Sequence, residues 1–201
     1  MNTPNFRERE FKYLLTEPVA LEEVGEKLKL ILKKSKVKIE KIVYCKTNDF
    51  YFPAPVNEIR RFRDSWGRND KGYSEHLQEI TIKRKDKPSI QNRFEYNFRF
   101  FAESSEDAYK LLEFMFGPPQ GKLYKKEVIF FLEGHVVLSV TTINNLDAVY
   151  LEMEGPSLKS VKATNALIKP NFKMKMQTHS FFEQYIEVKL PPEAPNEEKP
   201  Q

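Results

Sequence analysis

Three charged side chains alternate along the chain close to its N-terminus: Glu8, Glu10 and Lys12. If this segment is a β-strand, all three point to one face, because side chains two residues apart lie on the same side of a strand. Phe11 and Tyr13 then point to the other face, which is expected to pack against protein. Two carboxylates and an ammonium group on an inward face are costly to bury unless a ligand uses them. A metal cation together with a polyanion would use both signs of charge.

The composition fits one folded domain, since 201 residues with 40% hydrophobic content are enough to bury a sizeable core. The longest apolar run, residues 128–132, is too short to cross a bilayer, and the charged N-terminus lacks the apolar stretch of a signal peptide. We therefore expect a cytoplasmic protein without a membrane partner. A net charge of +4 indicates no clear nucleic-acid surface, and both a monomer and a homodimer fit the sequence.

The sequence offers little for a thiol or zinc site. Cys45 is the single cysteine, which excludes an intrachain disulfide, and the three histidines are scattered. Cys45 is expected to be a small buried apolar residue. A bound metal would therefore need oxygen ligands, which favours magnesium, manganese or calcium over zinc.

Hydrophobic periodicity predicts an α+β chain. Helical spacing is expected over residues 21–32, 104–116, 158–167 and 180–188, and strand-like alternation over 6–13, 37–53, 59–63, 79–83, 93–99, 123–132, 136–143 and 149–154. A turn or bulge is expected at residues 47–49, within the strand-like stretch 37–53, and a hairpin turn is expected at Glu133-Gly134.

Two other regions are expected to lie outside regular structure. Residues 66–74 are rich in Gly, Asn and Asp and predict a loop, in which Trp66 would be a partly buried cap on the fold and not a base-stacking platform. Residues 190–201 are rich in Pro and Glu and are expected to be disordered. Residues 1–189 are predicted to form a single domain.

The inward positions of the expected strands are mostly charged, whereas the alternate positions are apolar or aromatic. An antiparallel sheet could not hold such a set against a hydrophobic core. Either this side of the sheet faces solvent, or the sheet closes on itself and the charged side lines a tunnel. Paired Glu-x-Glu and Arg-x-Arg positions favour the tunnel. The set consists of Glu8, Glu10, Lys12, Arg61, Arg63, Lys83, Arg93, Glu95, Lys126, Glu152 and Glu154.

The segment Glu8-x-Glu10-x-Lys12 resembles the ExExK strand of the CYTH domain, which belongs to the triphosphate tunnel metalloenzymes. Further short matches follow in the family's order: Arg61-x-Arg63, Thr81-x-Lys83, Arg93-x-Glu95, Lys126 and Glu152-x-Glu154. The aromatic segment 181–185 is similar to the one near the end of these domains. The resemblance spans residues 6–188, and its weight comes mainly from the order of the motifs.

The resemblance implies a closed eight-stranded antiparallel β-barrel flanked by helices, with a small-molecule triphosphate or nucleotide bound inside. Lys12, Arg61, Arg63, Lys83, Arg93 and Lys126 would hold the phosphates. Glu8, Glu10, Glu152 and Glu154 would hold Mg²⁺ or Mn²⁺. Lys12 and Glu95 would take part in catalysis: Lys12 would assist the attacking water, and Glu95 would accept a hydrogen bond from a water or join the metal ligands. The expected reaction is hydrolysis of tripolyphosphate, a nucleoside triphosphate or another organic triphosphate.

The chain departs from the family pattern at four positions, and two alternatives to hydrolysis therefore stay open. Asn97 replaces an expected acid, Thr141 an expected Asp, and Val128 and Val137 expected cations. One alternative is a class IV-type adenylyl cyclase, which makes cyclic AMP from ATP. The other is a catalytically decayed tunnel that binds or senses a phosphorylated ligand or nucleotide. Lys125 and Glu127 lie one residue out of phase, and a bulge would exchange the faces of this strand.

Overall fold

A computed structural model describes residues 7–55, 58–85, 93–100, 105–143, 146–178 and 181. The strands are β1 (Arg7–Leu15), β2 (Ile39–Phe52), β3 (Glu58–Asn69), β4 (Ser74–Lys85), β5 (Arg93–Phe100), β6 (Gly121–Leu132), β7 (Val136–Ile143), β8 (Leu146–Gly155) and β9 (Met174–Met176). The helices are α1 (Leu21–Lys34), α2 (Ser105–Phe116) and α3 (Leu158–Ile168), with 3-10 turns at Glu133–His135 and Lys169–Asn171. The tail 190–201 and most of the helix expected at 180–188 lie outside the described residues. Within the described part of the chain, no helix is long and apolar enough to span a membrane.

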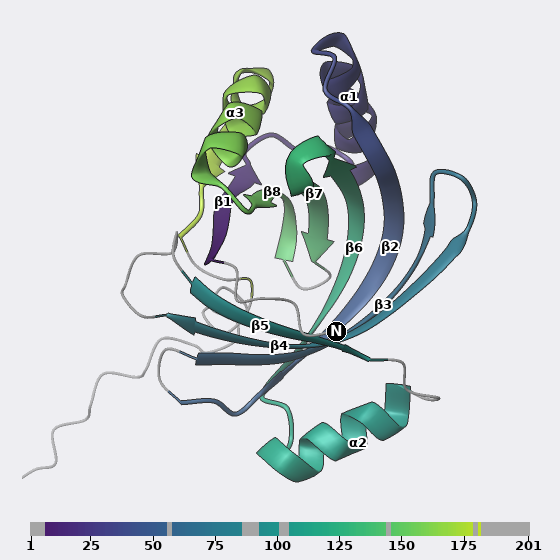
Figure 1. Cartoon of the computed structure of the whole chain (residues 1–201), viewed down its shortest axis with the longest axis vertical. Coiled ribbons are helices and arrows are strands. Elements are labelled where there is room, and N and C mark those ends of the chain that lie inside the picture. Colours follow the sequence, from purple (N-terminus) through teal and green to yellow (C-terminus); the bar gives the residue numbers. More distant parts are fainter. Residues whose placement is uncertain are drawn as a thin grey trace, which may run out of the picture.

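All strands belong to one antiparallel sheet with the order β5-β4-β3-β2-β6-β7-β8-β1-β9. Two further residue pairs, Arg7 with Phe94 and Glu8 with Arg93, link β1 to β5. Figure 1 shows β4 and β5 running at a steep angle to β6, β7 and β8, so the sheet is strongly bent. The predicted α+β class and antiparallel sheet flanked by helices are confirmed. Because the β1–β5 link is limited to two pairs, complete closure into a barrel stays a prediction.

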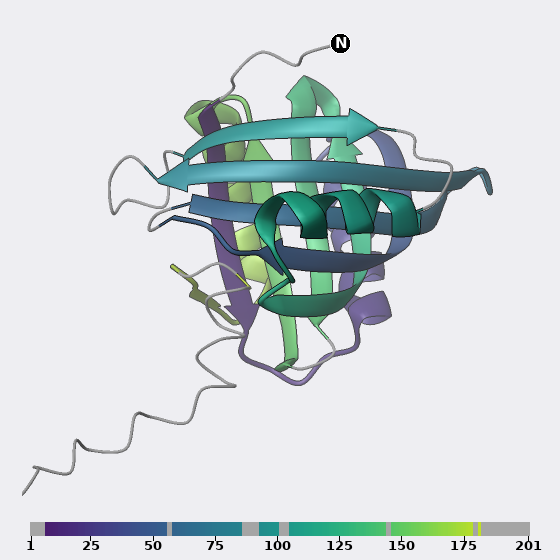
Figure 2. The same ribbon diagram turned by 90° about the horizontal axis from the view of Figure 1, so that it is seen from below.

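The helices cover the outer side of the sheet. Leu28 and Leu32 of α1 and Val161 of α3 join a large core with Val128 and Phe130 of β6. Leu112 of α2 packs in a second core with Phe52 and Phe62 of β2 and β3. Figures 1 and 2 show α1 and α3 at one end of the molecule and α2 at the other. The apolar positions of the strands are therefore satisfied from outside.

The opposite side of the sheet is polar and enclosed. Asp49 and Thr141 are fully buried, and Lys125 is 2% exposed. A solvent-facing polar sheet, the first of the two arrangements considered from sequence, would leave such side chains exposed. The interior of the bend is therefore ionic, as a tunnel requires.

The turn or bulge predicted at residues 47–49 is wrong, and the loop predicted at residues 66–74 is right only in its second half. Residues 47–49 lie inside β2, where they pair with both β3 and β6. Trp66 and Gly67 lie inside β3, and Gly67 serves close strand approach, since a Cβ there would lie 2.6 Å from the Tyr44 carbonyl oxygen. The turn comes later: Asn69 Oδ1 accepts hydrogen bonds from the backbone N–H groups of Lys71 and Tyr73, both at 3.0 Å.

Candidate functional site

A cavity of about 240 Å³ lies on the polar side of the sheet. Eight strands, β1 to β8, supply the lining, so residues far apart in the sequence converge there. The polar lining residues are Glu10, Lys12, Tyr51, Arg61, Arg63, Glu79, Thr81, Lys83, Asn97, Arg99, Lys125, Glu152 and Glu154. Ile129, Phe131 and Val137 contribute an apolar part of the wall.

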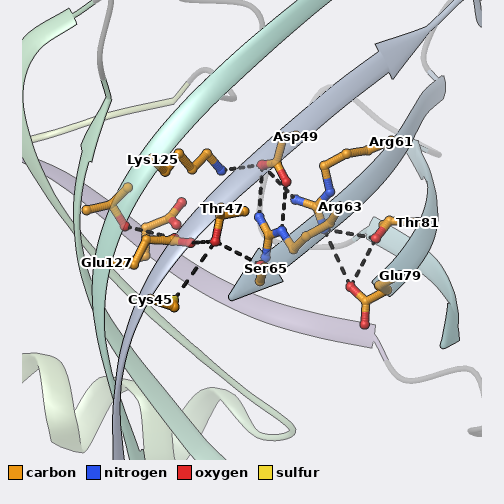
Figure 3. A network of polar contacts seen from close by, with 12 residues as sticks. Cys45, Thr47, Asp49, Arg61, Arg63, Ser65, Glu79, Thr81, Lys125 and Glu127 are labelled. Atoms are coloured by element: carbon orange, nitrogen blue, oxygen red, sulfur yellow. Dashed lines mark hydrogen bonds and ion pairs between the residues drawn. The ribbon is translucent and has the colours of Figure 1, made fainter. Parts of the chain in front are cut away.

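The Asp49 carboxylate contacts three of the cations at the cavity (Figure 3). Arg63 donates to both of its carboxylate oxygens, at 2.8 Å from Nε and 3.0 Å from Nη2. Lys125 Nζ lies 2.5 Å from Oδ2, and Arg61 Nη1 lies 3.9 Å from the same oxygen. Burial raises the pKa of Asp49, but the charges of Arg63, Lys125 and Arg61 outweigh burial and hold it well below 3.8. Asp49 is therefore an anion that fixes the cation cluster.

The pKa values of Arg63 and Lys125 shift in opposite directions, although both side chains contact Asp49. Burial lowers the pKa of Arg63, but Asp49 overrides burial and the net shift is well upward. Burial also lowers the pKa of Lys125, and there the opposing attraction of Asp49 does not restore it, because Arg63 adds repulsion. Lys125 is thus the cation of this cluster that gives up its proton most readily.

Arg61 links this cluster to β4. Its Nη2 donates to Thr81 Oγ1 at 2.9 Å and lies 3.7 Å from Glu79 Oε1. Glu79 also accepts from Arg99 Nε at 3.1 Å. The Nε of Arg61 is buried and has no hydrogen-bond acceptor among the described residues. A buried N–H group without an acceptor costs free energy, so this atom is available to an anionic ligand.

The acidic part of the cavity is formed by β1 and β8. Lys12 Nζ lies 3.3 Å from Glu10 Oε1 and 2.8 Å from Glu152 Oε1. Glu10 is directly opposite Glu154 in the strand pairing, and like charges in such positions repel. Burial raises the pKa of Glu152, Lys12 lowers it, and Glu10 raises it again. The ammonium group of Lys12 therefore lies between two carboxylates that would otherwise repel each other.

The chemistry of these residues fits a hard divalent cation. Within the described ranges, no three His, Cys, Asp or Glu side chains gather as a ready metal site. The donors nearby are nevertheless carboxylates only, and Lys12 already shows that a positive charge is stabilised between Glu10 and Glu152. Magnesium and manganese prefer such oxygen donors. A metal held there would share or take the position of the Lys12 ammonium.

A second buried polar cluster lies next to the cations (Figure 3). Glu127 accepts hydrogen bonds from Thr47 Oγ1 at 2.7 Å and from Thr141 Oγ1 at 3.2 Å. Cys45 is adjacent, and burial, followed by the charge of Glu127, raises its pKa to about 12. A thiol with so high a pKa is a poor nucleophile. Cys45 was expected to be buried, and in the structure it is half-buried.

A small cluster of apolar side chains borders the polar interior beside Lys12 and Lys125. Tyr51, Leu123, Tyr150 and Phe181 form a small core there. The Phe181 ring lies under two cations, 4.2 Å from Lys12 Nζ and 4.8 Å from Lys125 Nζ. These cation–π contacts hold both ammonium groups toward the cavity.

A larger open groove of about 1020 Å³ lies outside this interior, between the end of β1, the start of α1 and β6 to β8. Its charged lining residues are Glu17, Glu22 and Lys126. They do not converge on a cation cluster, so the smaller cavity is the candidate site.

Most residues predicted from sequence for the site lie together. Glu10, Lys12, Arg61, Arg63, Lys83, Glu152 and Glu154 all line the cavity. The side chains of Glu8, Arg93 and Glu95 lie outside the described part of the structure, although the backbones of Glu8 and Arg93 pair where β1 meets β5. Their predicted roles stay untested.

Lys126 is the exception. It is exposed on the outer side of β6, whereas Lys125 points inward. The sequence analysis assigned Lys126 to the inner face of this strand, whereas the inner face begins with the preceding residue, Lys125. For the same reason Val128 is not a cavity residue: it packs in the outer core beneath α1. Asn97 and Val137 do line the cavity, and Thr141 points to the inner side, as expected from the comparison with the family pattern.

Sequence analysis missed Asp49, Glu79 and Arg99, and it noted Lys125 and Glu127 only as residues one position out of phase with the expected motif. For Asp49 the signal was present, because Thr47, Asp49 and Tyr51 keep the period of two expected for one face of a strand. The turn propensity of Thr-Asn-Asp concealed it. Glu79 and Arg99 likewise share the inner face with Thr81 and Asn97.

Comparison with known proteins shows the fold. No family model matches the chain, and no curated protein matches it in sequence. Solved structures do match. The protein PH1819 from Pyrococcus horikoshii has a TM-score of 0.64 at 18% identity, covering 90% of this chain and 99% of that chain. A candidate adenylate cyclase from Vibrio parahaemolyticus has a TM-score of 0.57 at 14% identity, covering 89% and 97%.

A third similar structure is HpAC1 from Hippeastrum, a candidate adenylyl cyclase with a dominant triphosphatase activity. Its TM-score is 0.55 at 15% identity, and the match covers 92% of this chain and 98% of that chain. These likenesses confirm the CYTH-type fold indicated by the strand motifs. At such identities they carry the fold and not the activity.

Proposed function

We propose that this chain is a divalent-metal-dependent triphosphate phosphohydrolase that binds its substrate inside a closed eight-stranded barrel. The observation that carries the proposal is Arg61 Nε, a buried donor without an acceptor among the described residues, at a cavity shared with Arg63, Lys125 and Lys12. Buried donors of this kind need an anionic partner. Pairing of β1 with β5 supports the closed form.

The balance of charge supports a metal requirement. The cavity lining and its direct polar neighbours include six described acids (Glu10, Asp49, Glu79, Glu127, Glu152 and Glu154) and six described cations (Lys12, Arg61, Arg63, Lys83, Arg99 and Lys125). These charges cancel, so a triphosphate alone would leave the interior strongly negative. Divalent cations entering with the substrate would offset the added charge.

The proposed roles follow from charge and position. Arg61, Arg63, Lys83 and Lys125 bind and orient the phosphates, with Arg93 as a further expected contact. Glu10, Glu152 and Glu154, with Glu8 as an expected fourth, would hold Mg²⁺ or Mn²⁺, which supplies charge neutralisation at the transferred phosphoryl group. Lys12 shifts from the carboxylates toward the phosphates, and Glu95 accepts a hydrogen bond from the attacking water. The apolar cluster around Phe181 would limit the access of solvent to the part of the cavity next to Lys12 and Lys125.

Hydrolysis is ranked above cyclisation for one reason. Among the similar structures, a candidate cyclase is the one described with a dominant triphosphatase activity.

The test is a panel of tripolyphosphate, ATP and other organic triphosphates with Mg²⁺ or Mn²⁺, in which both phosphate and cyclic AMP are measured. We expect phosphate release that is lost in Glu10→Gln and retained in Lys126→Ala, because Lys126 is exposed on the outer face. Cyclic AMP in place of phosphate would favour the cyclase. No turnover of any triphosphate with either metal would refute hydrolysis.

Binding without turnover is the second candidate, and Val137 and Asn97 favour it. Both line the cavity, and neither supplies the charge expected there from the family pattern. Each missing charged contact weakens phosphate or metal binding by about 1.5 to 3 kcal/mol. Calorimetry that detects tripolyphosphate binding, combined with absence of product, would support this alternative.

A further inference from the structure

An exposed group of aromatic and basic side chains lies on the outer side of β2 and β3, away from the cavity. Trp66 is 55% exposed and Tyr44 is 44% exposed, whereas the sequence predicted Trp66 to be a partly buried cap in a loop. Lys46 and Arg68 are exposed beside them. We call Tyr44, Lys46, Trp66 and Arg68 the outer quartet.

The strand pairing gives the outer quartet a regular arrangement. Lys46 is directly opposite Trp66, and Tyr44 is directly opposite Arg68. Because residues two apart on one strand share a face, the aromatic rings occupy one diagonal of a square and the cations the other. Rings and positive charges therefore alternate at the spacing of neighbouring side chains.

The Trp66 ring is held in place from behind. It stacks on His76 with ring centroids 3.5 Å apart and an interplanar angle of 12°. Asp64 bridges the two rings: it accepts from Trp66 Nε1 at 3.3 Å, and its Oδ1 lies 2.6 Å from His76 Nε2. The indole thus forms a fixed platform with one face supported by protein. The nearest acid of this surface, Asp64, is occupied by that task and is mostly buried.

The positive charge continues across the sheet. Lys126 is directly opposite Lys46 on the next strand, and it too is exposed. Two like charges at facing positions repel, which costs stability unless an anion lies between or above them. The row from His76 through Trp66 and Lys46 to Lys126 crosses four strands, a span of about 14 Å at the usual strand spacing.

We propose that the outer quartet, extended by Lys126, binds single-stranded nucleic acid. A fixed ring offers a stacking surface to a base, and the alternating cations match the phosphates that separate successive bases. An acidic peptide would meet the cations but would have no use for a supported indole face. A duplex would not expose its bases to the platform. This inference does not depend on the triphosphate chemistry proposed for the cavity.

The chain carries a single tryptophan, so intrinsic fluorescence reports on Trp66 alone. We would titrate the full chain with a single-stranded oligonucleotide that bears a 5′-hydroxyl and therefore no triphosphate for the cavity. We expect quenching of Trp66 and an affinity that falls with salt. Each phosphate neutralised in a single strand contributes a slope of about −0.7 in log K against log salt, so Lys46, Arg68 and Lys126 together predict a slope of about −2.

Variants separate this surface from other sites. Lys46→Ala is expected to reduce the salt slope by about 0.7, whereas Lys162→Ala, an exposed lysine on α3, is expected to leave it unchanged. Trp66→Ala, followed by fluorescence polarisation of a labelled oligonucleotide, is expected to weaken binding at least about fivefold. Circular dichroism checks that each variant is folded, and Trp66→Phe serves as the conservative variant that retains a stacking ring.

Several results would overturn the proposal. One is an absence of quenching and polarisation change with both RNA and DNA strands. Another is binding that persists unchanged in folded Lys46→Ala and Trp66→Ala. Displacement of the oligonucleotide by tripolyphosphate would assign binding to the cavity, and equal quenching by polyglutamate would show a surface selective for charge alone. None of these outcomes bears on triphosphate hydrolysis, which is measured separately.

Discussion

Replacement of Lys12 by methionine is expected to strengthen metal binding while it weakens triphosphate binding. The ammonium group lies 2.8 Å from Glu152 Oε1 and 3.3 Å from Glu10 Oε1, so it occupies the charge position that a metal would need. A charged hydrogen bond at the shorter distance contributes about 1.5 to 3 kcal/mol, and the longer contact adds less. At about 1.4 kcal/mol per tenfold change, Lys12→Met should bind Mn²⁺ roughly 10- to 100-fold more tightly.

The assay is a Mn²⁺ titration in the absence of triphosphate, followed by electron paramagnetic resonance or calorimetry. Mildly alkaline buffer is preferred, because burial already raises the pKa of Glu152 and loss of Lys12 would raise it further. Lys41→Met is a matched control, since Lys41 pairs with Glu75 at 2.9 Å outside the cavity and should leave metal affinity unchanged. A folded Lys12→Met variant with unchanged or weaker Mn²⁺ affinity would refute the reasoning.

Three further predictions concern stability and the cation cluster. Asp49→Asn should destabilise the fold by about 3 to 5 kcal/mol, because it leaves buried cations unpaired. The pKa of Asp49 in the folded protein lies below 3.8, so its contribution to stability is present above that pH and is lost as the pH falls through the folded pKa. Denaturant melts should show that the difference in unfolding free energy between wild type and Asp49→Asn shrinks in acid. A difference that stays constant with pH would contradict this. Lys125→Met should weaken tripolyphosphate binding by roughly tenfold or more in calorimetry, whereas Lys126→Met should not. The reverse result would support Lys126 as the phosphate-binding residue, as predicted from sequence. Gly67→Ala should lower the melting temperature, since its Cβ would lie 2.6 Å from the Tyr44 carbonyl oxygen, and an unchanged melting temperature would show that the strands can separate there at no cost.

The sequence was sufficient for features that depend on local period. Glu10 and Lys12 were assigned to the inner face by alternation alone, and both line the cavity. The apolar stripe of Leu21, Val24, Leu28 and Leu32 predicted α1, and the same residues are buried against the sheet. In each case one face of the element packs against protein and the other does not. The buried positions therefore recur with the repeat of the element, which is two residues in a strand and about 3.6 residues in a helix.

The errors occurred where neighbouring strands override local preference. Thr-Asn-Asp favours a turn in isolation, yet β2 is flanked by β3 and β6, so leaving the ladder there would break backbone hydrogen bonds on both sides. The side chains of Thr47 and Asp49 then find acceptors and donors in the polar interior. Single-sequence reasoning could not supply these partners, because they come from β3 and β6.

The face of β6 was misassigned for a related reason. Lys125 and Lys126 are adjacent and chemically identical, so residue type alone cannot tell which one points inward. The orientation of the strand is determined by Val128 and Phe130, which share the face of Lys126 and pack beneath α1. An apolar position at i+2 was therefore the better guide to the face than the expected place of a basic motif.

The arrangement of cores explains how an interior this highly charged can persist in a folded protein. Apolar burial is supplied by helices on the outer side, where Leu28, Phe130 and Leu112 lie, so the inner side is not required to form a hydrophobic core. The inner charges then need only to satisfy one another, and Asp49 does so for three cations at once. The described charges around the cavity balance. Arg61 Nε nevertheless has no hydrogen-bond acceptor among the described residues, so the interior retains a donor for an incoming anion. Stability without ligand and affinity for ligand are in this way assigned to different atoms of the same network.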